Sequence, residues 1–192
     1  MSYYYLIING INQVNQEDYQ AILSLFSEMM YRPSFKLETE NLIIIAEMKE
    51  DISFYDVISN TNQEFYLNLS LYESIEFQTI EELLKDLKNK SSILEFNTVY
   101  LNEKILIYNR FKPIFDEKTR QEMLKEFYYD QEFLHMIKVF LEKNQNSSEA
   151  SKALYLHRNT LNNRIEKFYK ITGYDLRKFE DAALIYIIVK DC

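Results

Sequence analysis

Amide, hydroxyl and cationic side chains recur at helical spacing near the carboxyl end of the chain. At about 100° per residue they fall on one helix face or beside it. The face holds Asn159, Thr160, Asn163, Glu166, Lys167 and Lys170, and Arg158 and Asn162 flank it. Amides pair with adenine edges, guanidinium groups with guanine edges or phosphates, and ammonium groups with phosphates. This combination of side chains favours contacts with a nucleic acid over catalysis.

Two short helices joined by a tight turn are expected to position these side chains. Asn146 and Glu149 fit a capping box at the start of the first helix, Tyr155–His157 form the turn, and Gly173 ends the second helix. The inward positions of both helices are apolar: Ala150, Ala153, Leu154, Leu161, Ile165 and Phe168. This is the layout of a helix-turn-helix, whose second helix enters the DNA major groove with its first turns.

The second helix and the turn before it supply the candidate DNA-binding residues. They are His157, Arg158, Asn159, Thr160, Asn162, Asn163, Arg164 and Lys167. Arg158, at the start of the helix, is suited either to a guanine edge or to a phosphate. Asn162 and Asn163 are suited to adenine, and Thr160 to a phosphate or a thymine methyl group.

Other members of this set have structural alternatives. Arg164 lies beside the apolar stripe, where it either braces the first helix through Glu149 or contacts DNA. His157 precedes the helix and either caps it or contacts a phosphate. Lys167 and Lys170 lie further along, where the DNA backbone is the expected target; the simpler interpretation is that they belong to a solvated helix face.

The charge of the chain is unevenly distributed. The whole chain carries a formal net charge of −8, whereas Ala150–Gly173 holds five cations against one acid, a local charge of +4. Excess acid lies in stretches such as Glu38–Asp51 and Glu73–Glu82. Because polyanions repel an acidic protein at long range, this distribution predicts a sequence-specific binder of double-stranded DNA with weak background affinity.

Residues 129–189 resemble the C-terminal helix-turn-helix domain of PucR/CdaR-type bacterial transcription regulators, which is itself similar to the DNA-binding part of Fis. The resemblance rests mainly on Leu156–Leu161, Arg164 and Ile171–Gly173, in that order. It implies a DNA-binding transcriptional regulator. The family often has a basic or aromatic residue after Leu161, where this chain has an asparagine pair, so the base preference of the family is not carried over.

The first part of the chain predicts a separate α+β domain. Its patterns give the order β-α-β-β-α-β-α-β, an antiparallel-rich sheet with helices on one face. The expected strands are Tyr3–Asn9, Phe35–Leu37, Leu42–Met48 and Phe65–Tyr72, followed by a last pair of short strands, Val99–Leu101 and Ile105–Tyr108, which the final β represents. The expected helices are Glu17–Tyr31, Ser53–Ser59 and Thr79–Lys90. The domains are therefore expected at 1–110, a regulatory and dimerisation domain, and at 119–192, the helical DNA-binding domain.

The element order of residues 1–110 resembles the GGDEF-like domain that precedes the helix-turn-helix in the same family. The hairpin at Glu38–Leu42 would replace the signature of active diguanylate cyclases. Only Gly10 and Gly173 are glycines, so no glycine in this hairpin lets a nucleotide phosphate approach the backbone. No carboxylate that could hold Mg²⁺ follows the first strand in Ile8–Asn12. A degenerate domain without enzyme activity is expected.

Composition and termini bound the remaining possibilities. Two histidines and the terminal Cys192 make a metal site improbable, and we expect no cofactor. The chain lacks a P-loop, HExxH, GxSxG or CxxC motif, the features of a signal peptide and an apolar run of bilayer length, so we expect a cytoplasmic protein with no membrane partner. A homodimer is expected through the closing helix around Phe179 and the helix around Phe140; the alternative is that both apolar stripes are buried within the core of a single chain. Whether an effector or partner protein binds is left open. The alternative function is a regulatory protein-interaction module that has lost DNA binding.

Overall fold

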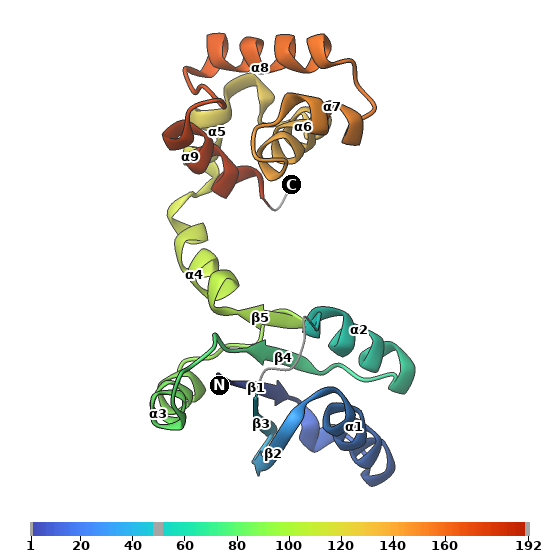
Figure 1. Cartoon of the computed structure of the whole chain (residues 1–192). Helices are drawn as coiled ribbons and strands as arrows, with labels where there is room; N and C mark the ends of the chain where they lie inside the picture. The colour runs from blue at the N-terminus through green and yellow to red at the C-terminus, as the bar shows by residue number, and fades with distance from the viewer. Residues whose placement is uncertain (1, 48–51, 191–192) are drawn as a thin grey trace. The chain divides into compact units, whose positions relative to one another are not determined.

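The computed structural model describes residues 2–47 and 52–190. The chain divides into two compact units, Met1–Ile107 and Tyr108–Cys192. The boundary falls inside helix α4, Glu103–Phe111. The first unit combines a sheet with helices and the second is helical (Figure 1).

The first unit is built on a five-stranded sheet of order β2-β3-β1-β4-β5. Strand β1 pairs antiparallel with both β3 and β4, whereas β4 and β5 are parallel. The elements up to β4 follow the β-α-β-β-α-β order of ferredoxin-like folds. The bounds are β1 Tyr3–Asn9, α1 Gln16–Met29, β2 Tyr31–Glu38, β3 Asn41–Glu47, α2 Phe54–Phe65, β4 Ser70–Glu73, α3 Ile80–Ser91 and β5 Tyr100–Asn102, with a 3₁₀ turn η1 at Ile11–Gln13.

Helices cover both faces of this sheet, so the expectation of helices on one face was wrong. Tyr4, Leu6 and Ile8 of β1 are buried together with side chains of α1 and α2. Tyr5 and Ile7, on the opposite face, are buried together with Leu83 of α3. Helix α3 lies on the other side of the sheet from α1 (Figure 1). An apolar run without alternation is typical of a strand covered on both sides, and β1 is such a run.

Two expected strands differ from the structure. Residues Ile105–Tyr108 are part of helix α4, and the expected strand at Phe65–Tyr72 begins only at Ser70, because α2 continues to Phe65. The backbone of Leu69, just before β4, bonds to the Asn62 side chain of α2 instead of to a strand. The Asn62 amide nitrogen donates to the Leu69 carbonyl and the Asn62 oxygen accepts from the Leu69 N–H, both at 2.8 Å.

The expected hairpin and the end of the first strand are confirmed. Strands β2 and β3 pair antiparallel down to Glu38 opposite Asn41, which leaves Thr39 and Glu40 as the turn. Gly10 follows β1 with φ of 90°, a left-handed conformation that favours glycine. The expected end of β3 at Met48 lies outside the described residues.

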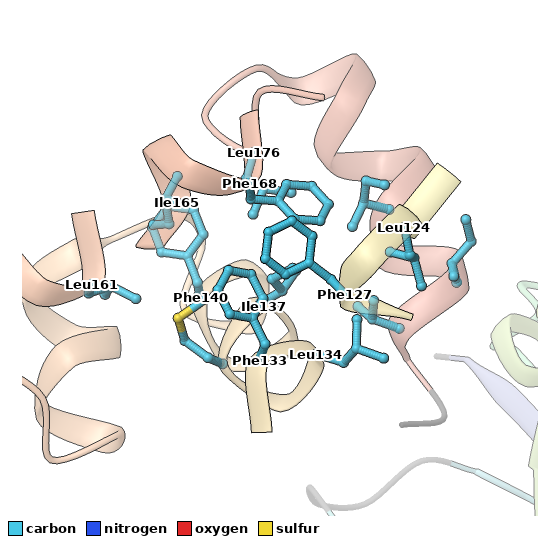
Figure 2. Packing of buried hydrophobic residues seen from close by; sticks show 14 of the residues in the cluster. Leu124, Phe127, Phe133, Leu134, Ile137, Phe140, Leu161, Ile165, Phe168 and Leu176 are labelled. Atoms are coloured by element: carbon cyan, nitrogen blue, oxygen red, sulfur yellow. The ribbon is translucent and has the colours of Figure 1, made fainter. Parts of the chain in front are cut away.

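The second unit packs its helices around one apolar core. The elements are η2 Lys112–Ile114, α5 Glu117–Leu124, η3 Lys125–Phe127, α6 Gln131–Glu142, α7 Ser147–Ala153, α8 Arg158–Thr172 and α9 Phe179–Val189. Phe127 packs against both Phe133 of α6 and Phe168 of α8, with ring centroids 4.3 and 5.3 Å away (Figure 2). Aromatic packing of this kind fixes the helix that carries the predicted DNA-binding residues to the rest of the unit.

Candidate nucleic-acid interface

Local signals at both ends hold α7 and α8 in a helix-turn-helix. The Asn146 side-chain oxygen accepts from the backbone N–H groups of Ser148 and Glu149 at 3.0 and 3.3 Å, which caps α7. Tyr155 in the turn has a φ of 53°. At the other end, Gly173 has a φ of 89° and its N–H donates to the Tyr169 carbonyl at 2.8 Å, as expected of a helix-terminating glycine.

The apolar stripe of α8 is buried as the spacing predicts. Leu161, Ile165 and Phe168 expose 2% of their surface or less, and they face the side chains of α6 in Figure 2. Burying such side chains stabilises by about 1.5–3 kcal/mol each. The opposite face of α8 is therefore turned to solvent in a fixed orientation.

The first turns of α8 present exposed polar side chains without internal partners. Arg158, Asn159, Thr160 and Asn163 are all exposed. Within the part of the chain that the structure describes, none of these four side chains makes a hydrogen bond or an ion pair. The structure thus brings together the four residues at the end of the helix that a helix-turn-helix presents to base edges.

The other predicted residues near the start of α8 have structural partners. His157 is the N-cap, since its Nδ1 accepts from the Asn159 N–H at 3.2 Å; of the two roles left open for it, the structure shows the cap. The Asn162 Oδ1 accepts from the Ser147 hydroxyl at 2.9 Å, which ties α8 to the start of α7. Asn162 and Asn163 are adjacent residues of the same type, but only Asn162 has a side-chain partner among the described residues.

The cations further along α8 are paired with carboxylates. The Arg164 guanidinium lies 3.1 Å from Glu132 of α6, so it braces α6, and the expected brace to Glu149 is not its contact. The Lys167 ammonium lies 3.2 Å from Glu126 and also stands over the Phe127 ring. Lys170 is 3.9 Å from Glu166, on the same helix.

The sequence did not identify Lys125, Glu126 and Phe127, in the segment before α6, as partners of α8. In η3, Lys125 Nζ donates to the Ile171 carbonyl at 2.6 Å, at the C-terminal end of α8 where a cation favours the helix dipole. Glu126 pairs with Lys167, and Phe127 packs beneath the same helix. These contacts join residues about forty positions apart in the chain, so no local sequence pattern predicts them.

The overall acidity of the chain belongs to the first unit. Between residues 108 and 192 there are 15 lysines and arginines against 13 aspartates and glutamates, a net charge of +2, while residues 1–107 carry 7 against 17, a net charge of −10. The unit with the helix-turn-helix is thus mildly basic. Long-range repulsion of DNA arises from the other unit.

The described part of the chain also bears on metal-ligand clusters and membrane-spanning helices. Residues 2–47 and 52–190 contain no group of three or more histidine, cysteine, aspartate or glutamate side chains placed to hold a metal ion. Over the same residues, no helix combines the length and apolarity needed to cross a bilayer.

Comparisons with known proteins point to the same region. Residues 133–190 match the model of the PucR C-terminal helix-turn-helix domain. Except for residue 190, the match lies within residues 129–189, for which the sequence predicted this resemblance. It covers less than a third of the chain.

Two curated relatives from Bacillus subtilis extend the comparison. The DNA-binding transcriptional activator AdeR is 26% identical over an alignment that covers 95% of this chain and 49% of AdeR. The purine catabolism regulatory protein is 34% identical, over 42% of this chain and 16% of that protein. This chain therefore spans about half or less of the length of these relatives.

One solved structure is also similar over the chain. It is the regulator of polyketide synthase expression from Bifidobacterium adolescentis, with 14% identity, 99% of this chain and 80% of that chain covered, and a TM-score of 0.39.

Proposed function

We propose that the chain is a sequence-specific, DNA-binding transcriptional regulator of the PucR/CdaR type that acts in the cytoplasm through α8. The observation that carries the proposal is the row of exposed, unengaged side chains at the start of α8, on a helix whose other face is buried. The matching helix-turn-helix model and relatives named as regulators support it. Neither relative is named as an enzyme, and we propose no catalytic role.

The chemistry of the first turns suits base recognition. Arg158 can form a bidentate pair with a guanine edge or hold a phosphate, and Asn163 can form the paired hydrogen bonds that recognise adenine. Thr160 can contact a thymine methyl group or a phosphate. Lys167 and Lys170 lie further along α8 and would reach the DNA backbone, where contacts position the protein without reading sequence.

The direct test is a selection from random DNA with the full chain at moderate salt. We expect enrichment of a defined sequence, and Arg158→Ala should weaken binding to it by about 1–3 kcal/mol while relaxing the choice at one base pair. Thr39→Ala, in the turn of the other unit, is the control that should leave affinity unchanged. Failure to enrich any sequence would refute the proposal.

The alternative is a protein-interaction module that kept the fold and lost DNA binding. Two observations favour it: the carboxylates paired with the cations of α8, and the acidity of the first unit. The same selection separates the two functions, because the alternative predicts no preferred DNA at any salt concentration.

We further propose that the regulator binds DNA as a homodimer. One recognition helix reads too few base pairs to single out a site in a genome, and a two-fold axis squares the discrimination. After the acidic residues of its first turn, helix α9 is apolar from Ala182 to Val189, which is typical of a helix covered all round. Most apolar side chains of α6 are buried in the core of the second unit, but Phe179 of α9 is 81% exposed.

The surface we assign to the second copy is a groove of about 450 Å³. Its lining combines apolar Leu141, Phe179, Ala182, Ala183 and Tyr186 with polar Glu142, Asn144 and Gln145. In sedimentation at micromolar concentration, the wild-type chain should exceed 23.2 kDa and Phe179→Ser should shift it towards that mass. Tyr129→Ser, which replaces another exposed aromatic residue, is the control. A wild-type monomer that protects a single half-site would contradict the dimer.

For the first unit we propose a degenerate GGDEF-like domain with a regulatory role. Support comes from its element order and from the hairpin between β2 and β3, which has Thr39 and Glu40 in the turn instead of glycines. Incubation of the full chain with GTP and Mg²⁺ should yield no cyclic dinucleotide above a control without protein. Clear turnover would contradict this assignment.

A further inference from the structure

Beyond its first turn, α8 presents cations that are all partly neutralised from within the second unit. Arg164 lies 3.1 Å from Glu132, Lys167 lies 3.2 Å from Glu126, and Lys170 lies 3.9 Å from Glu166. Two of these carboxylates come from other elements: Glu126 from η3 and Glu132 from α6. Arg158 alone among the described cations of α8 has no such partner.

The pairs made by Glu126 and Glu132 lie at the surface and are open to exchange. The side chains of Glu126 and Glu132 are 55% and 81% exposed, and those of Lys167 and Arg164 are 59% and 35% exposed. Ion pairs at such exposure are weak. A DNA phosphate can therefore replace either carboxylate without unfolding anything.

From this arrangement we propose that Glu126 and Glu132 are affinity-limiting residues that compete with DNA phosphates for Lys167 and Arg164. Each carboxylate occupies a cation that a phosphate would otherwise contact, and must be displaced when DNA binds. The inference rests on the proposed DNA-binding function and adds the residues that set its strength. Phosphate contacts carry no sequence information, so the competition lowers affinity for every sequence alike.

The consequence is a measurable change in the dependence of binding on salt. A cation that neutralises a phosphate and releases a condensed counterion contributes a slope of about −0.9 to a plot of log affinity against log salt. A cation that is already paired with a carboxylate of the protein contributes less to this slope, because its charge is partly neutralised before DNA binds. The wild-type slope should therefore be shallower than the number of cations on α8 implies.

The test uses the full chain and substitutions that keep side-chain size. Glu126→Gln and Glu132→Gln should each tighten binding to the selected sequence and to unrelated DNA by the same factor, roughly 1.5- to 5-fold. Both should steepen the salt slope by up to about 0.9. Glu122→Gln removes the same charge from a pair within α5, with Lys118 at 3.9 Å, and should leave both quantities nearly unchanged.

A double substitution ties the effect to the ion pair. In a Lys167→Ala background, Glu126→Gln should no longer tighten binding, because the cation it frees is absent. Weaker binding in either glutamine variant, or equal gains in Glu122→Gln, would overturn the inference while leaving DNA binding by the wild-type chain intact. If neither the wild-type chain nor the variants bind any DNA, the proposed function fails and the inference fails with it.

Discussion

Neighbouring asparagines on α8 should separate DNA recognition from folding. Asn162 and Asn163 are adjacent and both exposed, yet only Asn162 has an internal partner among the described residues, the Ser147 hydroxyl at 2.9 Å. Replacing each with alanine removes the same amide from the same helix. The two variants therefore serve as matched controls for each other.

The expected magnitudes follow from these contacts. Asn162→Ala loses an exposed hydrogen bond, for which the low end of the usual range, about 0.5 kcal/mol of the free energy of unfolding, applies. In a unit of this size, that lowers the melting temperature by about 2–4 °C. Asn163→Ala loses no internal contact and replaces asparagine with a better helix former, so its stability should change by less than about 0.5 kcal/mol.

The effect on DNA binding should run in the opposite order. If Asn163 pairs with adenine, its loss should cost about 1–3 kcal/mol at one base pair, a roughly 5- to 150-fold drop in affinity. Fluorescence anisotropy with the selected DNA measures this drop, and thermal unfolding of the same samples measures stability. A larger loss of affinity in Asn162→Ala than in Asn163→Ala, with both chains folded, would refute the proposed orientation of α8 towards DNA.

Two further predictions concern stability. Gly173→Ala should destabilise the second unit by about 1–2 kcal/mol, because the φ of 89° is strained for an L-residue, although nothing lies within 4 Å of the added Cβ. Gly173→Asn should destabilise it less. Hydrogen exchange at the end of α8 would measure the difference in stability between the two variants. Burial raises the pKa of Tyr100 to about 12 and raises the pKa values of Tyr4, Tyr5 and Tyr72 further above their usual range. Because the protonated phenols are favoured in the folded state, the stability of the first unit should be fully present below pH ~10 and fall as the pH rises through 10 to 12. Unfolding followed against pH tests this, and Tyr100→Phe should flatten the decline; a pH-independent midpoint in that range would contradict it.

Features with local causes could be read from the sequence. The Asn146 cap, the Gly173 stop and the stripe of Leu161, Ile165 and Phe168 depend on residues within one or two helical turns of each other, and all are present in the structure. The β2–β3 hairpin is local in the same sense. Such elements are set by backbone preference and periodicity, which the order of residues determines directly.

Ambiguous patterns were resolved only by tertiary packing. Ile105–Tyr108 is a short apolar run, and such runs fit a strand or a buried helix equally well; in the structure they form part of α4. The continuous run of β1 likewise does not say which helices cover which face. The placement of α3 opposite α1 and α2 depends on the order in which the strands pair.

Tertiary structure also decided which polar side chains of α8 have partners within the protein and which do not. The sequence places Asn162, Asn163 and Lys167 at polar positions and Arg164 beside the apolar stripe, but it does not say which residues inside the protein will pair with them. Ser147, Glu132 and Glu126 approach them across 15 to 41 residues of chain, brought there by the burial of Phe127, Phe133 and Phe168. Helical spacing fixes the direction in which a side chain points, whereas its partner depends on which distant segment the apolar core brings alongside.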